Sequence, residues 1–414
     1  MMSTIPRLHW RKAVPVRLVP LALIFSLLIS LSLSTGTFAA SQQTVAPDGP
    51  GALSYFDLAR KDCVGTARDT TSKVWFTLAD GVLSDVYYPT IDNTNVKTLQ
   101  YIVTDGSTFT DLQTRDTTYT VQLLDKHALD CRVTTTAKSG KYSIVTDYLT
   151  DPGRNAVAMH VSFKPLVGTL SNYKLYVRYD PTINGNGGGG SGNGGADTAL
   201  TDISSGHPLP VAYDTNTKTN AVNRTYAVPV YSALAASSPF LQVSSGFVGQ
   251  PSDGQVQLDS AHALTNIYNE ADNGNVVQTA QVDLARSENF TLALGFATKQ
   301  SDAVSIARGT ATASFHDMQQ LYEGQWHDYD RGLIAPPTHF KNVSEKQWQT
   351  LVDDYYLSAN VIRASQDKTF AGAEVASLAS PWGQAVSAGD PNNTYFGSYR
   401  EVFARDLYEA WTGF

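Results

Sequence analysis

The sequence predicts a chain of several domains, in which a large antiparallel β sandwich is followed by helices. Between about residues 54 and 298, short runs rich in Val, Thr and Tyr recur without helical periods between them, a pattern typical of an antiparallel sandwich. Near residue 310 the hydrophobic period changes from that of a strand to that of a helix. Because no Pro/Ser-rich linker divides the β region, we expect one broad sandwich of two sheets over residues 45–308.

The first residues have the pattern of an export signal. Basic residues precede an apolar run at 18–33 and small residues follow it, so we predict a signal peptide over residues 1–39, cleaved after Ala39 or, as second choice, Ala40. An uncleaved anchor is the alternative, although the run is short for a membrane span of about 20 residues. We therefore expect a secreted or extracytoplasmic protein with no membrane contact after cleavage, and a mobile leader at 41–53.

The strands are marked by runs of β-forming residues and by turn residues. Residues 74–78 and 82–88 flank Asp80-Gly81, a pair typical of a two-residue hairpin turn. Further strands are predicted at 117–124, 142–149, 156–163 and 173–179. Residues 185–195 contain eight glycines, and because no Gly-Lys-Ser/Thr follows them, we predict a flexible loop between strands and not a phosphate cradle.

Three helices are predicted after the β region. Aromatic and apolar residues recur at steps of three and four over 315–329, which predicts a first helix in a helical linker at 309–340. A second helix is predicted to start at Ser344, where Ser344 and Gln347 can form a capping box. A third is expected to begin near Asp406.

Composition excludes several classes of protein. The formal net charge of -8 argues against a nucleic-acid partner, which requires a basic surface. The 21 Tyr and 6 Trp offer flat faces that suit sugars, but they suit the core of a large sandwich equally well. Because the motifs of zinc proteases, serine hydrolases and dinucleotide sites are missing, we expect no cofactor and no metal ligand set.

Cys63 and Cys131 are the only cysteines of the chain. Outside the cytoplasm such a pair can form a disulfide, which would stabilise the fold by roughly 4 kcal/mol. Two free buried thiols are nearly as well supported by the sequence. A zinc site is not expected, because no further ligands complete the set.

Residues 369–383 and 399–408 resemble the opening of the catalytic domain of bacterial glucoamylases and glucodextranases, a family of inverting glycoside hydrolases. The resemblance implies that residues 341–414 are the truncated start of an (α/α)6 barrel that follows the β domain. It also implies an exported exo-glycosidase, present as an N-terminal fragment, that hydrolyses terminal α-glucosidic bonds of α-glucan oligo- or polysaccharides with inversion. We expect it to be a monomer.

The resemblance also implies a sugar-binding site. In the family, an aromatic residue and an Arg-Asp pair line the subsite for the non-reducing terminal glucose, and Arg405 and Asp406 match the pair. Tyr399 matches a tyrosine beside that sugar, Phe403 stands where the family usually has Trp, and Trp382 lies in another segment near the pocket. A guanidinium donates and a carboxylate accepts, so the pair can hold two sugar hydroxyls.

Four of these residues also have a purely structural alternative. Asp406 with Glu409 can form a capping box for the third helix, and Arg405 can be an exposed surface residue. Tyr399 and Phe403 can belong to the core.

Inverting hydrolysis requires a general acid and a general base about 6.5–9.5 Å apart. No residue of this chain matches the family's acid or base, so we assign no catalytic residue and expect the chain to be inactive alone. Two other functions remain open, a stand-alone carbohydrate-binding or surface β sandwich and an extracellular phosphorylase of similar architecture. The glucan linkage is left open by the sequence, and so is a structural calcium, which the family can carry.

Overall fold

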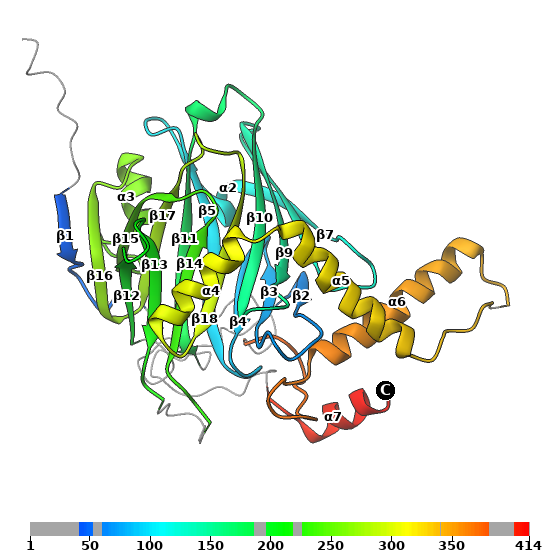
Figure 1. Ribbon diagram of the computed structural model, residues 1–414. Helices are drawn as coiled ribbons and strands as arrows, with labels where there is room; N and C mark the ends of the chain where they lie inside the picture. The colour runs from blue at the N-terminus through cyan, green and yellow to red at the C-terminus, as the bar shows by residue number, and fades with distance from the viewer. Residues whose placement is uncertain are drawn as a thin grey trace, which may run out of the picture. The chain divides into compact units, whose positions relative to one another are not determined.

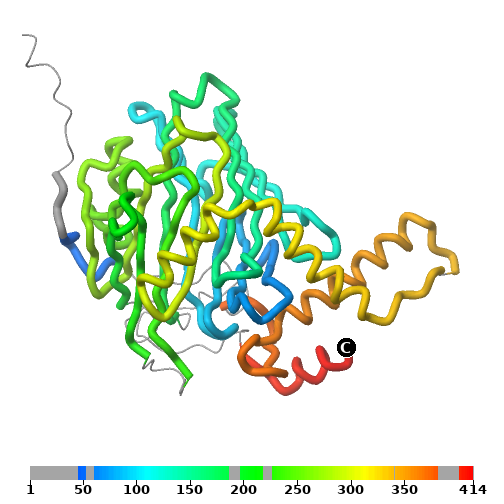
Figure 2. The backbone as a smooth tube through the Cα atoms, viewed as in Figure 1, coloured from blue at the N-terminus to red at the C-terminus, as the bar shows by residue number. Residues whose placement is uncertain are grey.

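The computed structural model describes residues 41–52, 60–185, 196–217, 226–339, 341–380 and 401–413. Figure 1 labels most elements of these residues and Figure 2 traces their backbone. The predicted signal peptide at 1–39 lies outside the described residues, as does most of the glycine-rich loop at 185–195.

Two sheets form the β region of the described residues. The first has the order β1-β16-β12-β13-β14-β18-β10-β9-β8-β7, with bounds β1 Ser41–Val45, β16 Asn266–Gly274, β12 Asp197–Asp202, β13 Leu209–Asp214, β14 Val230–Ala236, β18 Asn289–Ala297, β10 Ala156–Pro165, β9 Tyr142–Thr150, β8 Cys131–Ala137 and β7 Thr117–Leu123. The second has the order β15-β17-β11-β5-β4-β3-β2, with bounds β15 Phe240–Phe247, β17 Val276–Val282, β11 Lys174–Gly185, β5 Thr94–Thr104, β4 Val82–Tyr87, β3 Trp75–Ala79 and β2 Cys63–Gly65. A further strand, β6 (Thr110–Leu112), pairs with β5. The predicted antiparallel sandwich is confirmed.

The N-terminal strand β1 is the exception to antiparallel pairing. It pairs in parallel with β16, and Ala46 N continues the ladder to Glu270 O at 2.7 Å. Farther along, Asn275 N donates to Pro50 O at 2.7 Å. The expectation of a mobile leader at 41–53 is therefore wrong for the described residues, because their backbone groups bond to the edge of the first sheet.

The predicted hairpin is confirmed at β3 and β4. Leu78 pairs with Leu83 and Ala79 with Val82. The turn residues between them have positive φ, 50° at Asp80 and 74° at Gly81, as a type I′ hairpin turn requires.

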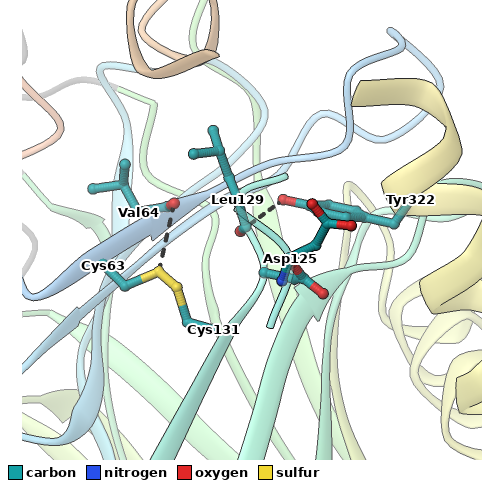
Figure 3. The surroundings of a disulfide bond; sticks show 7 residues. Cys63, Val64, Asp125, Leu129, Cys131 and Tyr322 are labelled. Carbon is teal, nitrogen blue, oxygen red and sulfur yellow. Dashed lines mark hydrogen bonds between the residues drawn. A yellow bond between two sulfur atoms is a disulfide. The ribbon is translucent and has the colours of Figure 1, made fainter. Parts of the chain in front are cut away.

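The core lies between the two sheets and a disulfide links them. Cys63 of β2 bonds to Cys131 of β8, so the bridge joins the second sheet to the first (Figure 3). Of the two states that the sequence left open, the structure has the disulfide. Next to it, Tyr322 Oη donates to Leu129 O at 2.9 Å, which ties a helix to the same corner.

Helices begin earlier than the sequence predicted. α4 (Gln300–Thr312) packs on β14 and β18 (Figure 1). Its buried face consists of three alanines with Val304 and Thr310, and it lacks the large residues that mark a helix in the sequence. Gly295 of β18 permits this close approach, because a Cβ there would lie 2.6 Å from Ala307 N. The domain limits at 308/309 and 340/341 stay a prediction.

The other helices follow the predicted pattern. α5 (Phe315–Gly332) buries Met318, Tyr322 and Trp326, and α6 (Glu345–Ala364) starts with the predicted Ser344–Gln347 capping box. α7 spans Ala404–Trp411. The described residues also contain three short helices: α2 Gln113–Asp116, α3 Gly254–Ala261 and a 3-10 turn at Leu170–Asn172. No helix in the described ranges is long and apolar enough to cross a membrane.

Candidate functional site

The segment after α6 docks on the end of the second sheet. Asp367 Oδ2 accepts a hydrogen bond from Ile91 N at 2.8 Å, in the loop between β4 and β5. Its other oxygen accepts from Thr369 N and Phe370 N at 2.6 and 2.7 Å, which closes a local turn. One carboxylate therefore shapes this segment and fixes it to the β domain.

The far end of the same segment is fixed by Ser380. Its backbone N donates to Asp85 Oδ2 at 2.9 Å, and its hydroxyl lies 2.8 Å from Thr94 Oγ1. Asp85 also pairs with Lys61 at 2.9 Å. Between the two ends, an apolar cluster joins the segment to β3 and β4; its members are Trp75, Tyr87, Ile91, Val375 and Leu378.

The two segments that resemble the glycosidase family meet in the structure. Ala376 N donates to Glu401 O at 3.1 Å, which places the residues before α7 against the docked segment. Because 365–380 is held at both ends, this bond gives α7 a defined starting point.

Arg405 and Asp406 lie in the first turn of α7. Their side chains are 79% and 34% exposed, and Arg405 Nη2 lies 3.4 Å from Asp406 Oδ2. A pair this exposed adds little to stability, so both groups remain available to a ligand. The carboxylate also lies near the helix N-terminus, where negative charge is favoured.

The capping-box alternative for Asp406 and Glu409 is wrong. The N-cap of α7 is Phe403, and no side chain caps the helix there. Asp406 is the third helical residue, so its carboxylate is not required to start the helix. Phe403 is half-buried, beside the exposed Val402 and Ala404. Trp382 and Tyr399 lie outside the described residues.

A pocket next to α7 was not predicted. Its volume is about 560 Å³, and it is lined by Arg68, Tyr329, Arg363, Gln366 and Trp411. A second cavity of about 160 Å³ shares Arg68, Arg363 and Gln366 with it and adds Lys368 to the wall. No local sequence pattern marks these pockets, because their residues come from the β2–β3 loop, α5, α6, α7 and the docked segment.

Lys368 is the most perturbed cation of this region. Burial lowers its pKa to about 7, although the nearby Asp69 acts in the opposite direction. Its Nζ donates to Ala67 O at 2.6 Å and to Ser72 O at 2.7 Å, and it lies 5.2 Å from the centroid of the Trp75 ring.

Two groups of buried carboxylates can be compared with a catalytic pair. Glu374 is buried and accepts from Gln366 Nε2 at 3.2 Å, and burial raises its pKa. Burial and the neighbouring Glu323 raise the pKa of Asp130 to about 7. Asp130 is fully buried under α5, and Glu374 is buried as well. Neither carboxylate therefore lies in an open pocket beside a second free carboxylate, as a catalytic pair requires. No set of three His, Cys, Asp or Glu residues in the described ranges could hold a metal ion.

Comparison with known proteins gives one coherent result. The family model described as glucodextranase, domain N, matches residues 46–331. A glucoamylase of Clostridium sp. (strain G0005) is 32% identical over 369 residues, which are 89% of this chain and 47% of that protein. A crystal structure of a bacterial glucoamylase complexed with acarbose matches with a TM-score of 0.75 at 31% identity, over 89% of this chain and 49% of that one. The chain thus spans about half the length of both relatives.

Proposed function

Because the chain belongs to the family described as glucodextranase, domain N, we propose that it is the β domain and the start of the catalytic domain of an exported glucoamylase-type exo-glycosidase. The observation that carries this proposal is the extent of the glucoamylase match. It covers 89% of the chain, whereas the family model ends at residue 331, so the likeness continues into the helical region.

The proposed reaction is hydrolysis of terminal α-glucosidic bonds of α-glucans with inversion. An acid protonates the leaving oxygen while a base activates water on the opposite face of the sugar. We assign neither role to a residue of this chain. The half of the relatives that the chain does not span is where we expect both carboxylates.

The residues of this chain would bind the terminal glucose. Arg405 would donate to one hydroxyl and Asp406 would accept from its neighbour. Phe403, Tyr399 and Trp382 would supply aromatic faces for the C–H surface of the ring. The exposure of Arg405 and Asp406 supports this role, since neither side chain is committed to the core.

The β domain would act as the rigid base of the site. Asp367 fixes the docked segment to the loop between β4 and β5, and Ser380 fixes it to β4 of the second sheet. Ala376 links the segment to Glu401, just before α7. A sugar subsite held on such a frame keeps its donors and acceptors in place.

Export is part of the proposal. The Cys63–Cys131 disulfide supports it, because structural disulfides persist in oxidising compartments. The basic and apolar start of the chain supports it as well.

The test is expression of the whole reading frame that contains residues 1–414, with any codons that follow. The purified product is incubated with maltooligosaccharides and isomaltooligosaccharides, and NMR follows the anomer of the released glucose. First appearance of the β anomer supports an inverting α-glucosidase. Glucan binding without hydrolysis would instead support the stand-alone carbohydrate-binding protein.

A further inference from the structure

We propose that the cavity where the β2–β3 loop meets α5 and α6 is a binding site for a small dianionic oxyanion of the sulfate or phosphate type. We call it the junction pocket and define it by Arg68, Tyr329, Arg363, Gln366 and Lys368. The proposal does not depend on the proposed glycosidase activity.

Three cations line the junction pocket. Arg68 comes from the β2–β3 loop, Arg363 from the last turn of α6, and Lys368 from the docked segment. Among the described residues, none of the three forms an ion pair with a carboxylate. Three unpaired positive charges around one cavity repel one another, and a bound anion would offset that repulsion.

The same repulsion acts on the pKa values of these groups. Burial, and then the charge of Arg363, lower the pKa of Arg68. Burial lowers the pKa of Lys368, and Arg68 and Arg363 both add to that effect.

The nearby carboxylates are occupied elsewhere. Asp69 accepts from Thr71 N at 3.1 Å and from Gln325 Nε2 at 2.7 Å. Asp367 accepts from three backbone N–H groups of its own turn and of the β4–β5 loop. Asp69 and Asp367 both reduce the positive potential of the pocket, but neither forms an ion pair with a guanidinium group.

Two polar atoms of the pocket residues lack partners. Arg68 Nε and Tyr329 Oη are buried, and among the described residues neither has a hydrogen-bond partner. The Arg68 guanidinium lies over the Tyr329 ring, 4.9 Å from its centroid. A donor buried without an acceptor is destabilising. Because both atoms lack accessible surface, a bound oxyanion would contact the outer nitrogens of the Arg68 guanidinium.

The smaller of the two cavities has room for a small anion. The inner cavity holds about 160 Å³, and the larger pocket that shares its wall holds about 560 Å³. Arg68 and Arg363 line both cavities. An anion bound between these two arginines would contact two guanidinium groups. Guanidinium groups bind oxyanions through paired N–H donors.

Binding should depend on the charge of Lys368. The charged groups that act on it are Arg68 and Asp69 of the loop, Arg363 of α6 and Asp367 of its own segment. Tyr329 of α5 lines the adjoining pocket, and Lys73 donates to the neighbouring Thr369. Since the pKa of Lys368 is about 7, the ammonium is present below that pH and lost above it. Sulfate keeps its charge over this range, so any change of affinity reports on the protein.

The experiment is isothermal titration of the purified chain with sodium sulfate at pH 6.0 and pH 8.5, at an ionic strength held constant with sodium chloride. We expect saturable one-to-one binding at pH 6.0 and affinity at least threefold weaker at pH 8.5. Arg363→Gln and Arg68→Gln should each weaken binding at least tenfold. Circular dichroism and the melting temperature without sulfate check that the variants fold.

Arg331→Gln is the matched control, because it removes one positive charge from an exposed arginine of α5 that pairs with Asp328. It should bind sulfate like the wild type. Arg363→Lys keeps the charge but loses the paired donors of the guanidinium, so it should bind sulfate less tightly than the wild type and more tightly than Arg363→Gln. If Arg363→Gln does not fold, Arg68→Gln carries the test. No saturable binding, or equal weakening in Arg331→Gln and Arg363→Gln, would overturn the proposal.

Discussion

The carboxyl groups of Asp130 and Glu323 share the amide of Gln319, whose Nε2 lies 3.3 Å from Asp130 Oδ2 and 2.7 Å from Glu323 Oε1. Asp130 belongs to the turn before β8 and Glu323 to α5, so this contact joins the β domain to the helix that follows it. Two carboxylates at one buried contact cannot both ionise cheaply.

This contact predicts a pH dependence of stability. Burial and Glu323 raise the pKa of Asp130 to about 7 in the folded chain, above its value in an unfolded one. The folded state therefore binds more protons, and stability is lost as pH rises from about 4 towards 7. Asp130→Asn should melt above the wild type at pH 8 and close to it at pH 4, as followed by circular dichroism.

Asp130→Asn keeps an acceptor for the bond from Asp125 N and adds an amide donor for Glu323. Asp283→Asn, in the turn between β17 and β18, is the control and should leave the pH profile unchanged. Parallel pH profiles for wild type and Asp130→Asn would show that this carboxyl does not titrate in the expected range.

The disulfide predicts a large loss of stability on its removal. It closes a loop of 68 residues between the two sheets, for which the chain-entropy model gives about 4 kcal/mol. The double variant Cys63→Ser/Cys131→Ser should lose roughly that much free energy of unfolding in urea, relative to the oxidised wild type. Addition of a reductant to the wild type should reproduce the loss, and an unchanged midpoint in both would contradict it.

Asp406→Asn separates sugar binding from helix stability. Because Phe403 is the N-cap, loss of the Asp406 charge should change the melting temperature little. In the whole enzyme, kcat/KM for maltooligosaccharides should fall at least about tenfold, or ~1.4 kcal/mol, if the carboxylate holds a glucose hydroxyl. Glu409→Gln, exposed on the same helix, is the control; kinetics of Asp406→Asn that match it would end the assignment.

The 414-residue chain by itself should release no glucose from maltooligosaccharides or isomaltooligosaccharides. We find no acid and base pair at an open site in its described residues, and such groups typically contribute about 10²–10⁴-fold each to the rate. The assay is coupled glucose detection at ordinary enzyme concentration, with heat-treated protein as the blank. Release above that blank would reveal a catalytic pair in this chain.

The local patterns of the sequence predicted much of the fold. The Asp80-Gly81 turn, the aromatic face of α5 and the capping box of α6 are all decided by residues close in the chain, and all three are confirmed. β1 and α4 were missed for the opposite reason. β1 is held by an edge strand more than 200 residues away, and α4 shows an alanine face that resembles no strong periodic pattern.

Of the candidate site, too, one part could be predicted from the sequence and another part could not. Arg405 and Asp406 were identified through a family resemblance, and their role stays a prediction. The junction pocket could not be predicted, because Arg68 and Arg363 meet only after α6 has packed beside the β2–β3 loop. Asp367 carried a weak signal, since an Asp two residues before Thr is typical of a local turn, but its bond to Ile91 is a tertiary contact.

One apolar cluster limits how short a folded piece of this chain can be. Its members are Trp75, Tyr87, Ile91, Val375 and Leu378. A β domain excised at the end of the family match, residue 331, would lack Val375 and Leu378 and expose two large aromatic side chains of the second sheet. Such a patch favours aggregation. The smallest autonomous folding unit therefore reaches to Ser380, and a shorter piece, cut at the limit of sequence similarity, would leave its own sheet uncovered.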